Sequence, residues 1–236
     1  MRLDKFLADL GYGTRSEVKN FIKKGNITVN GTKINKPEFK IDENKDEIMY
    51  NNQIIEYKKY QYFLLNKPSG CVTATNDNVH KTVMDYLEAE TKKYKNLSPV
   101  GRLDKDTEGL LLITNDGLLS HDLLSPSHHV AKKYYVELDG QVDESLIEEF
   151  KRGVDIGDDK LTKPAELEIL KPNNTAYLTI IEGRFHQVKR MFAAKNLKVT
   201  YLKRVEMSIL NLEGLEKGEY RALTNAEIEV LHSNKK

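Results

Sequence analysis

The chain has 236 residues, of which 39% are hydrophobic and 31% charged, and a formal net charge of +1. This length allows one large domain or a small domain followed by a medium one, in a globular protein. The single cysteine, Cys71, excludes an intramolecular disulfide, and the longest apolar runs are too short to span a membrane. We therefore expect a cytoplasmic protein without a membrane partner.

The N-terminal region predicts two short helices followed by a tight hairpin. The helices are expected over residues 3–10 and 14–25, and the hairpin turn at Asn30-Gly31. Thr14 and Glu17 have the spacing of a capping box at the start of the second helix. So small a unit buries little core, which favours a docking module over an enzyme.

Charge is distributed unevenly along the chain. Residues 15–40 carry seven basic side chains against two acids: Arg15, Lys19, Lys23, Lys24, Lys33, Lys36 and Lys40. Residues 184–204 carry seven basic side chains and no acid. Two separate basic regions on a nearly neutral protein indicate a polyanionic partner that is contacted in two places. The alternative is that these charges are merely solvated.

The remainder predicts a strand-rich body behind a linker at residues 56–60. Strands are expected over residues 62–65, 71–75, 110–114, 134–138, 165–170 and 176–181, with a turn at 115–117. Helices are expected over 144–152, 186–195 and 225–231. The fold class is α+β, with a mixed and mainly antiparallel sheet flanked by helices. No glycine-rich phosphate loop follows a strand, so we expect no nucleotide cofactor. No four cysteine or histidine residues have the spacing of zinc ligands, so we expect no such metal site.

Three segments carry candidate chemistry. In the first, Asp104 lies between Arg102 and Lys105 just before a buried strand. A carboxylate near such cations can serve as a nucleophile or a base, whereas the alternative is an ordinary surface ion pair.

The second segment begins the helix at residues 186–195. Val188, Met191 and Phe192 form one face, which leaves His186, Lys189 and Arg190 on the other. With Arg184 and the amide of Gln187, this face suits phosphate contacts or an ionised carboxylate. In the third segment, strand alternation directs Tyr134 and Tyr135 to opposite sides, so that one can reach a site while the other packs. The alternative is that the tyrosine belongs to the core.

Together these segments resemble the pseudouridine synthases, in particular the branch whose best-known member modifies small-subunit ribosomal RNA. The N-terminal helices and hairpin resemble its S4 RNA-binding domain. Residues 101–117 are similar to the catalytic-aspartate motif, 132–134 to the tyrosine motif, 182–191 to the basic motif and 218–224 to the C-terminal signature.

The resemblance implies an S4-like domain at residues 1–57 and a catalytic domain at 61–236. It implies Asp104 as the nucleophilic carboxylate, Tyr134 as the residue that contacts the uracil, and Lys189 as the partner of Asp104, with Arg190 as the substitute. Much of the wider superfamily has arginine at the position of Lys189. No metal or organic cofactor is implied, and whether Asp104 attacks the sugar, attacks the ring or removes a ribose proton stays open.

The implied partner is structured RNA, either ribosomal RNA or an assembling ribosomal subunit, bound by a monomer. The expected RNA contacts are Arg15, Lys19, Lys23, Lys24, Lys33, Arg102, Arg184, His186, Gln187 and Arg190. Two alternatives remain open at this stage. One is a large-subunit ribosomal RNA target, and the other is a non-catalytic S4-type RNA-binding or ribosome-assembly protein.

Overall fold

The computed structural model of the protein describes residues 1–43, 45–55, 59–125 and 127–233. The chain forms two units, one of Met1–Gln61 with Leu87–Leu97 and one of Tyr62–Tyr86 with Ser98–Lys236. Most of the linker predicted at residues 56–60 lies outside the described residues. Within the described part of the chain, every helix is too short or too polar to cross a bilayer.

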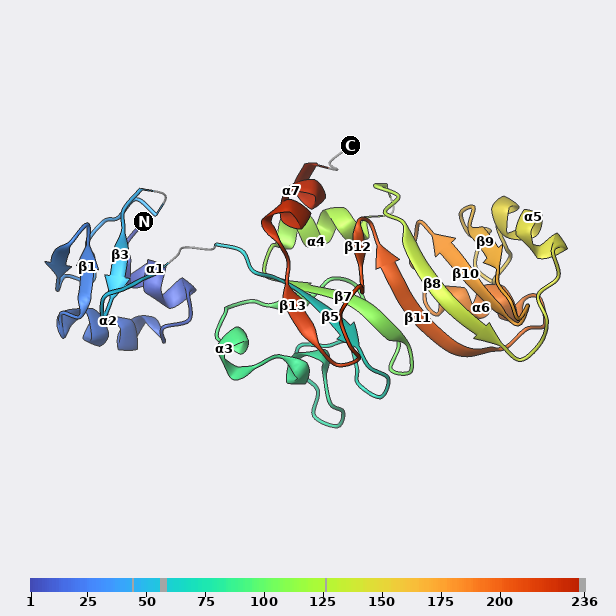
Figure 1. The fold of residues 1–236 in the computed structure, drawn as a ribbon, viewed down its shortest axis with the longest axis horizontal. Coiled ribbons are helices and arrows are strands. Elements are labelled where there is room, and N and C mark those ends of the chain that lie inside the picture. The colour runs from blue at the N-terminus through green and yellow to red at the C-terminus, as the bar shows by residue number, and fades with distance from the viewer. Residues whose placement is uncertain (44, 56–58, 126, 234–236) are drawn as a thin grey trace. The chain divides into compact units, whose positions relative to one another are not determined.

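The N-terminal unit confirms the predicted helices and hairpin (Figure 1). Its elements are α1 (Leu3–Asp9), α2 (Arg15–Lys23), β1 (Ile27–Val29), β2 (Thr32–Ile34), β3 (Ile48–Tyr50), β4 (Gln53–Ile54) and α3 (Ala89–Lys92). Thr14 Oγ1 accepts from the Glu17 amide at 3.3 Å, and the Glu17 carboxylate accepts from the Thr14 amide at 2.7 Å. Asn30 and Gly31 both have positive φ, as a type I′ turn requires.

The strands of this unit follow the order β2-β1-β3-β4, and the sequence did not predict the last two. Phe6, Val18, Ile22 and Ile27 belong to the apolar core that the helices and sheet share. Because that core occupies one face of α2, Lys19 and Lys23 are exposed on the other. Neither lysine forms an ion pair within the described residues.

The second unit is built on a nine-stranded sheet in the order β13-β5-β7-β11-β8-β10-β9, with β12 pairing with β11 and β6 with β7. Its strands are β5 (Tyr62–Lys67), β6 (Ser98–Pro99), β7 (Glu108–Thr114), β8 (Lys132–Leu138), β9 (Glu166–Ile169), β10 (Thr175–Ile180), β11 (Val199–Met207), β12 (Leu210–Asn211) and β13 (Tyr220–Ala222). Its helices are η1 (Val83–Tyr86), α4 (Gly117–Leu124), α5 (Ser145–Arg152), α6 (Gln187–Ala193) and α7 (Asn225–Ser233).

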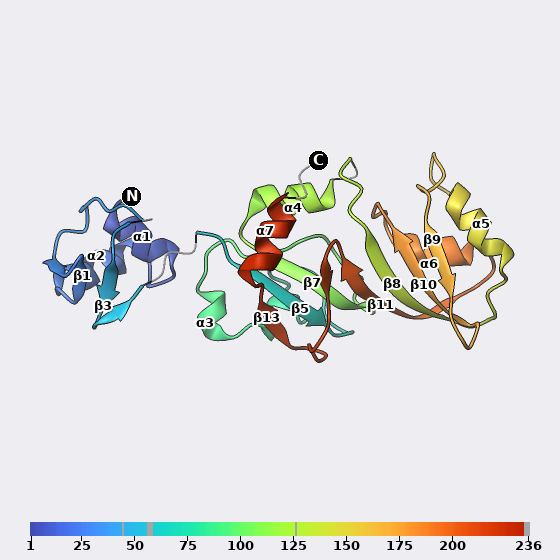
Figure 2. The same ribbon diagram turned by 45° about the horizontal axis from the view of Figure 1, so that its top comes forward.

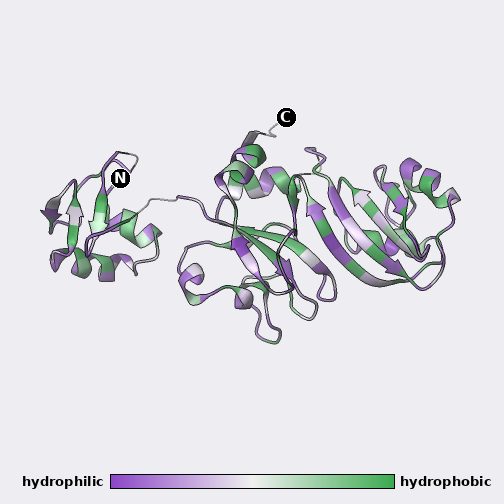
Figure 3. Ribbon diagram, viewed as in Figure 1, coloured by the Kyte–Doolittle hydropathy of each residue, from purple (hydrophilic) through white to green (hydrophobic). Residues whose placement is uncertain are grey.

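Helices cover both halves of this sheet. Phe150 of α5 and Phe192 of α6 pack with ring centroids 5.1 Å apart, beside the half that contains β8 to β10. At the other half α4 and α7 lie close together in both views (Figures 1 and 2). There the Tyr62 hydroxyl donates to Asp116, which begins α4, and lies 3.1 Å from His232 of α7. The strands of this unit carry both apolar and polar residues (Figure 3), and burial alternates residue by residue along β8 because one of its faces packs.

The structure departs from the sequence prediction at three places in this unit. Residues 71–75 form no strand, since the side chain of Thr73 bonds Leu103 and only Val72 forms an isolated bridge. The predicted turn at residues 115–117 does end β7, but it leads directly into α4, which the sequence did not predict. The Asp116 carboxylate begins this helix by accepting from the amides of Leu118 and Leu119. The nine-residue strand β11 was missed, because two register shifts interrupt the alternation of its buried side chains.

The two halves of the sheet join where β7 runs parallel to β11. Among the strand pairings of the described residues this one alone is parallel, and it aligns Arg204 with Gly109. Gly109 has φ of +103°, and a Cβ placed there would lie 2.1 Å from the Arg204 carbonyl oxygen. Only glycine therefore permits this approach.

We predict that Gly109→Ala destabilises the protein by about 3 kcal/mol or more, through backbone strain and overlap with β11. Urea denaturation provides the measurement. Gly117→Ala is the matched control, because a Cβ at Gly117 meets no atom within 4 Å. Equal stability of the two variants would contradict the claim that only glycine at position 109 lets β7 approach β11.

Candidate active site

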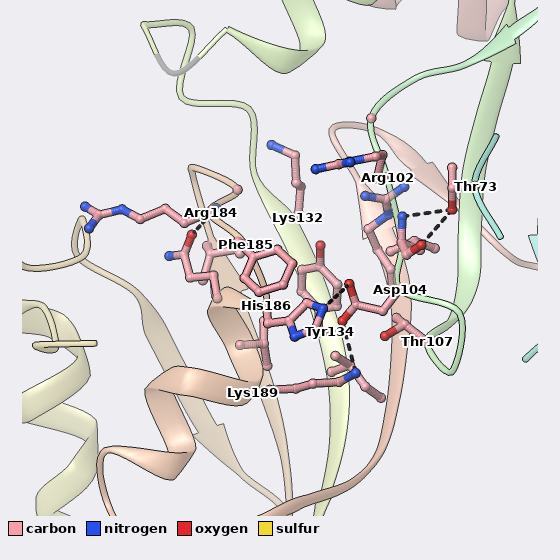
Figure 4. Close-up of a pocket in the computed structure, with 18 of the residues that line it drawn as sticks. Thr73, Arg102, Asp104, Thr107, Lys132, Tyr134, Arg184, Phe185, His186 and Lys189 are labelled. Atoms are coloured by element: carbon pink, nitrogen blue, oxygen red, sulfur yellow. Dashed lines mark hydrogen bonds and ion pairs between the residues drawn. The ribbon is translucent and has the colours of Figure 1, made fainter. Parts of the chain in front are cut away.

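A cavity of about 670 Å³ opens beside the joint of the two sheet halves. Its walls come from the loop before β7, from β8 and β11, and from the loop that leads into α6 (Figure 4). Asp104 is the sole acid among the described residues that line it, whereas the lining cations are Arg102, Lys105, Lys132, Arg184, Lys189 and Arg204. The cavity therefore combines one carboxylate with an excess of positive charge.

Asp104 is held by two groups from the α6 region. Its Oδ2 lies 3.0 Å from Lys189 Nζ, and its Oδ1 lies 3.4 Å from His186 Nε2. Lys189 also bonds Asp106 at 2.6 Å, but the Asp106 side chain is 71% exposed. Burial opposes the charge on Lys189, yet its bonds to Asp106 and Asp104 outweigh burial and raise its pKa. The lysine thus stays charged beside a carboxylate that faces the cavity.

The loop that carries Asp104 is fixed from beneath by Lys67. This side chain is fully buried, and its ammonium donates to the backbone carbonyls of Asp104 at 3.0 Å and Thr107 at 2.8 Å. Burial lowers the pKa of Lys67, and the carbonyl oxygens take the place of the lost water. Since Thr73 also bonds Leu103 in both directions, the loop is held on either side of Asp104.

Tyr134 and Tyr135 occupy opposite faces of β8, as strand alternation predicts. Tyr134 is 8% exposed and lines the cavity, and Figure 4 shows its ring beside His186 and Asp104. Tyr135 packs edge-on against Tyr177 and Tyr201 on the other face. The structure thus brings Asp104, Tyr134 and Lys189 together at one site.

The predicted RNA contacts near α6 divide into two groups. Arg102 is exposed at the cavity wall, and His186 stacks on Phe185 while approaching Asp104. By contrast, the Gln187 side chain is buried and bonds Glu182 and the Arg184 amide. Its amide group is therefore directed into the protein instead of toward a ligand.

The side chains of Arg184 and Arg190 likewise form hydrogen bonds within the protein. Arg184 donates to the carbonyls of Lys160 and Leu161, and Figure 4 shows its guanidinium directed away from Asp104. Arg190 bonds Asp158 and the Ile156 carbonyl. Arg190 therefore does not replace Lys189 as the partner of Asp104 in this structure.

Lys132, Arg204 and Phe185 line the cavity but were not among the site residues predicted from the sequence. Lys132 and Arg204 are buried cations on neighbouring strands, and Phe185 is 70% exposed with its ring stacked 3.9 Å from His186. Lys132 precedes Tyr134 by two positions, so strand alternation could have placed it on the same face. Arg204 gave no such signal, because the register shift that follows it in β11 hides its face.

Comparison with known proteins agrees with this arrangement. Residues 61–194 match the RNA pseudouridylate synthase family and residues 1–48 match the S4 domain. The chain is 43% identical to the uncharacterized RNA pseudouridine synthase YtzG of Bacillus subtilis, over 98% of both chains. It is 42% identical to ribosomal small subunit pseudouridine synthase A of Escherichia coli, over 97% of this chain and 98% of that one.

A crystal structure of a pseudouridylate synthase is also similar, with 40% identity and a TM-score of 0.68. The alignment covers 98% of this chain and 99% of that one. Family match, near-complete coverage and fold all agree with the resemblance expected from residues 101–117, 132–134 and 182–191. The chain belongs to the RNA pseudouridylate synthase family and is a pseudouridine synthase with an N-terminal S4 domain.

Proposed function

We propose that the protein isomerises a uridine of small-subunit ribosomal RNA and that Asp104 is its nucleophilic carboxylate. The supporting observation is the position of Asp104, the one acid lining the cavity within the described chain, 3.0 Å from the Lys189 ammonium. We assign residues 1–57 to RNA docking and 61–236 to catalysis. We further propose that the protein acts in the cytoplasm as a monomer.

The chemistry fits a single carboxylate. The reaction breaks the bond from uracil N1 to ribose C1′, turns the base and joins C5 to C1′, while C5 loses its proton and N1 gains one. Glycosidases that hydrolyse such bonds use two carboxylates, one of them an acid for the leaving group. Here the uracil is retained, so one carboxylate suffices once the bound RNA excludes water from the cavity. Attack on the sugar, attack on the ring and removal of a ribose proton all use this same group.

Tyr134 and Lys189 complete the proposed machinery. Lys189 holds the carboxylate in place, although an ammonium offers a single contact where arginine would offer two. Tyr134 stacks on the uracil or accepts the C5 proton. Because a stacked base cannot reach this cavity, the nucleotide must rotate out of its RNA helix. The proposed chemistry uses no cofactor.

We predict that Asp104→Asn folds and binds RNA but forms no pseudouridine. Release of tritium from RNA labelled at uridine C5 measures the reaction, because that hydrogen leaves when the new bond forms. Asp106→Asn is the matched control, since Asp106 bonds the same lysine but is largely exposed. It should keep most of the activity. Normal turnover by Asp104→Asn would refute the catalytic assignment.

The proposed substrate rests on similarity to the Escherichia coli enzyme, whose name specifies the small ribosomal subunit. We expect that deletion of the gene removes one pseudouridine from small-subunit ribosomal RNA. Mapping pseudouridines in both ribosomal RNAs, with and without the gene, measures this loss. Treating naked RNA and partly assembled subunits with purified protein then identifies which of the two is modified. Loss of a pseudouridine from large-subunit RNA alone would contradict the proposed target.

The exposed basic face of the S4 domain is the proposed docking surface for structured RNA. Arg15, Lys19 and Lys23 are exposed along α2, and Lys24 and Lys33 are exposed nearby. We predict that Lys19→Gln with Lys23→Gln weakens binding severalfold. It should also reduce the slope of log affinity against log salt by about two, one for each lost phosphate contact. An unchanged slope would favour a domain that binds protein instead.

A further inference from the structure

Two buried cations of the cavity have no part in the proposed chemistry. Lys132 is 7% exposed and Arg204 is 2% exposed, and both line the cavity. Lys132 and Tyr134 share the buried face of β8, and Arg204 lies opposite Tyr134 in the ladder between β8 and β11. Since paired residues of adjacent strands share a face, both cations flank the tyrosine on its cavity side.

Neither cation has an acidic partner among the described residues. Lys132 Nζ donates to the Val130 carbonyl at 3.0 Å, and Arg204 Nε donates to the Leu110 carbonyl at 2.7 Å. Arg204 Nη2 is buried without any hydrogen-bond partner. Burial, and then the nearby charge of Arg204, lowers the pKa of Lys132 to about 8. Buried charges without a counterion are costly, which indicates that a ligand supplies the negative charge.

Asp104 does not supply this charge. Its two oxygens face Lys189 and His186, and it forms no ion pair with Lys132 or Arg204 in the described structure. Figure 4 shows Lys132 and Arg102 on one side of Asp104 and Lys189 on the other. The cavity therefore has a second, positively charged region that is distinct from the partner of the carboxylate.

We propose that Lys132 and Arg204 bind the phosphodiester group next to the target uridine. The proposal rests on the proposed function and adds to it the contact that holds the flipped nucleotide. A nucleotide flips by rotation about its backbone, so an adjoining phosphate approaches the cavity with the base. Uracil is neutral, whereas two neighbouring cations match an anion. The guanidinium provides directed donors and the ammonium a point charge for the phosphate oxygens.

The test measures binding of the mapped RNA segment to the Asp104→Asn protein, with normal or neutral linkages at the target. A methylphosphonate replaces the phosphodiester 5′ or 3′ of the uridine. We expect one of these two replacements to weaken binding about tenfold. Adding Lys132→Met should weaken binding of RNA with normal linkages about tenfold. In that variant, replacing the phosphodiester by the methylphosphonate should weaken binding by less than a further twofold. Arg204→Lys keeps the charge, and in this variant the methylphosphonate should weaken binding less than it does in the protein with Arg204. We call this loss of affinity the linkage effect, and the lysine variant measures it even if Lys132→Met misfolds.

Lys133→Met is the matched control on the opposite face of β8, where Lys133 pairs with Glu168 and lies over the Tyr177 ring. It should keep both the affinity and the linkage effect. Undiminished binding by Lys132→Met, or an equal linkage cost in that variant, would overturn the phosphate site. Tritium release by the wild-type protein is scored separately. Its absence would refute the proposed function alone, and its presence without a linkage effect would refute the phosphate site alone.

Discussion

The close approach of β7 to β11 at Gly109 is the constraint on which the site depends. A side chain at this position would overlap the backbone of Arg204, so the two halves of the sheet could not join there. Asp104 enters from the β7 half, whereas Tyr134 and Lys189 come from the other half. The carboxylate and its partners therefore meet only because residue 109 of β7 is a glycine. Lys67 adds the second constraint, because its ammonium fixes the loop carbonyls around Asp104.

The distribution of charge separates the cavity into two parts. One negative side chain faces Lys189 and His186, and this part suits the chemistry of the glycosidic bond. Lys132 and Arg204 form the other part, which lacks a counterion among the described residues and suits a phosphate. An enzyme that must retain its leaving group benefits from such a division. The backbone of the nucleotide can be held by one set of charges while the base turns beside the other.

Local features of this protein could be predicted from its sequence, because local interactions determine them. The capping box of Thr14 and the turn at Asn30-Gly31 each involve a few adjacent residues, and both were predicted. The motifs around Asp104 and Tyr134 were found by resemblance, and the structure places both in one cavity. Their assigned roles remain proposals.

Features that depend on distant contacts were missed. Arg184 and Arg190 were predicted to bind phosphate, but their guanidinium groups donate to backbone carbonyls of loop residues 156–161. The face of Arg204 depends on register shifts in β11 that no simple alternation reveals. Residues 71–75 have the composition of a strand, yet Thr73 bonds a loop instead of a neighbouring strand. In each case tertiary contacts outweigh the local preference.

The most direct measurement is the distance from residue 104 to the target nucleotide in a crystal structure of Asp104→Asn bound to its RNA. The account predicts a flipped uridine whose reacting carbon lies about 3–3.5 Å from the side chain of residue 104, with its base against Tyr134. A uridine that remains stacked in the RNA, or one bound in a different cavity, would contradict it.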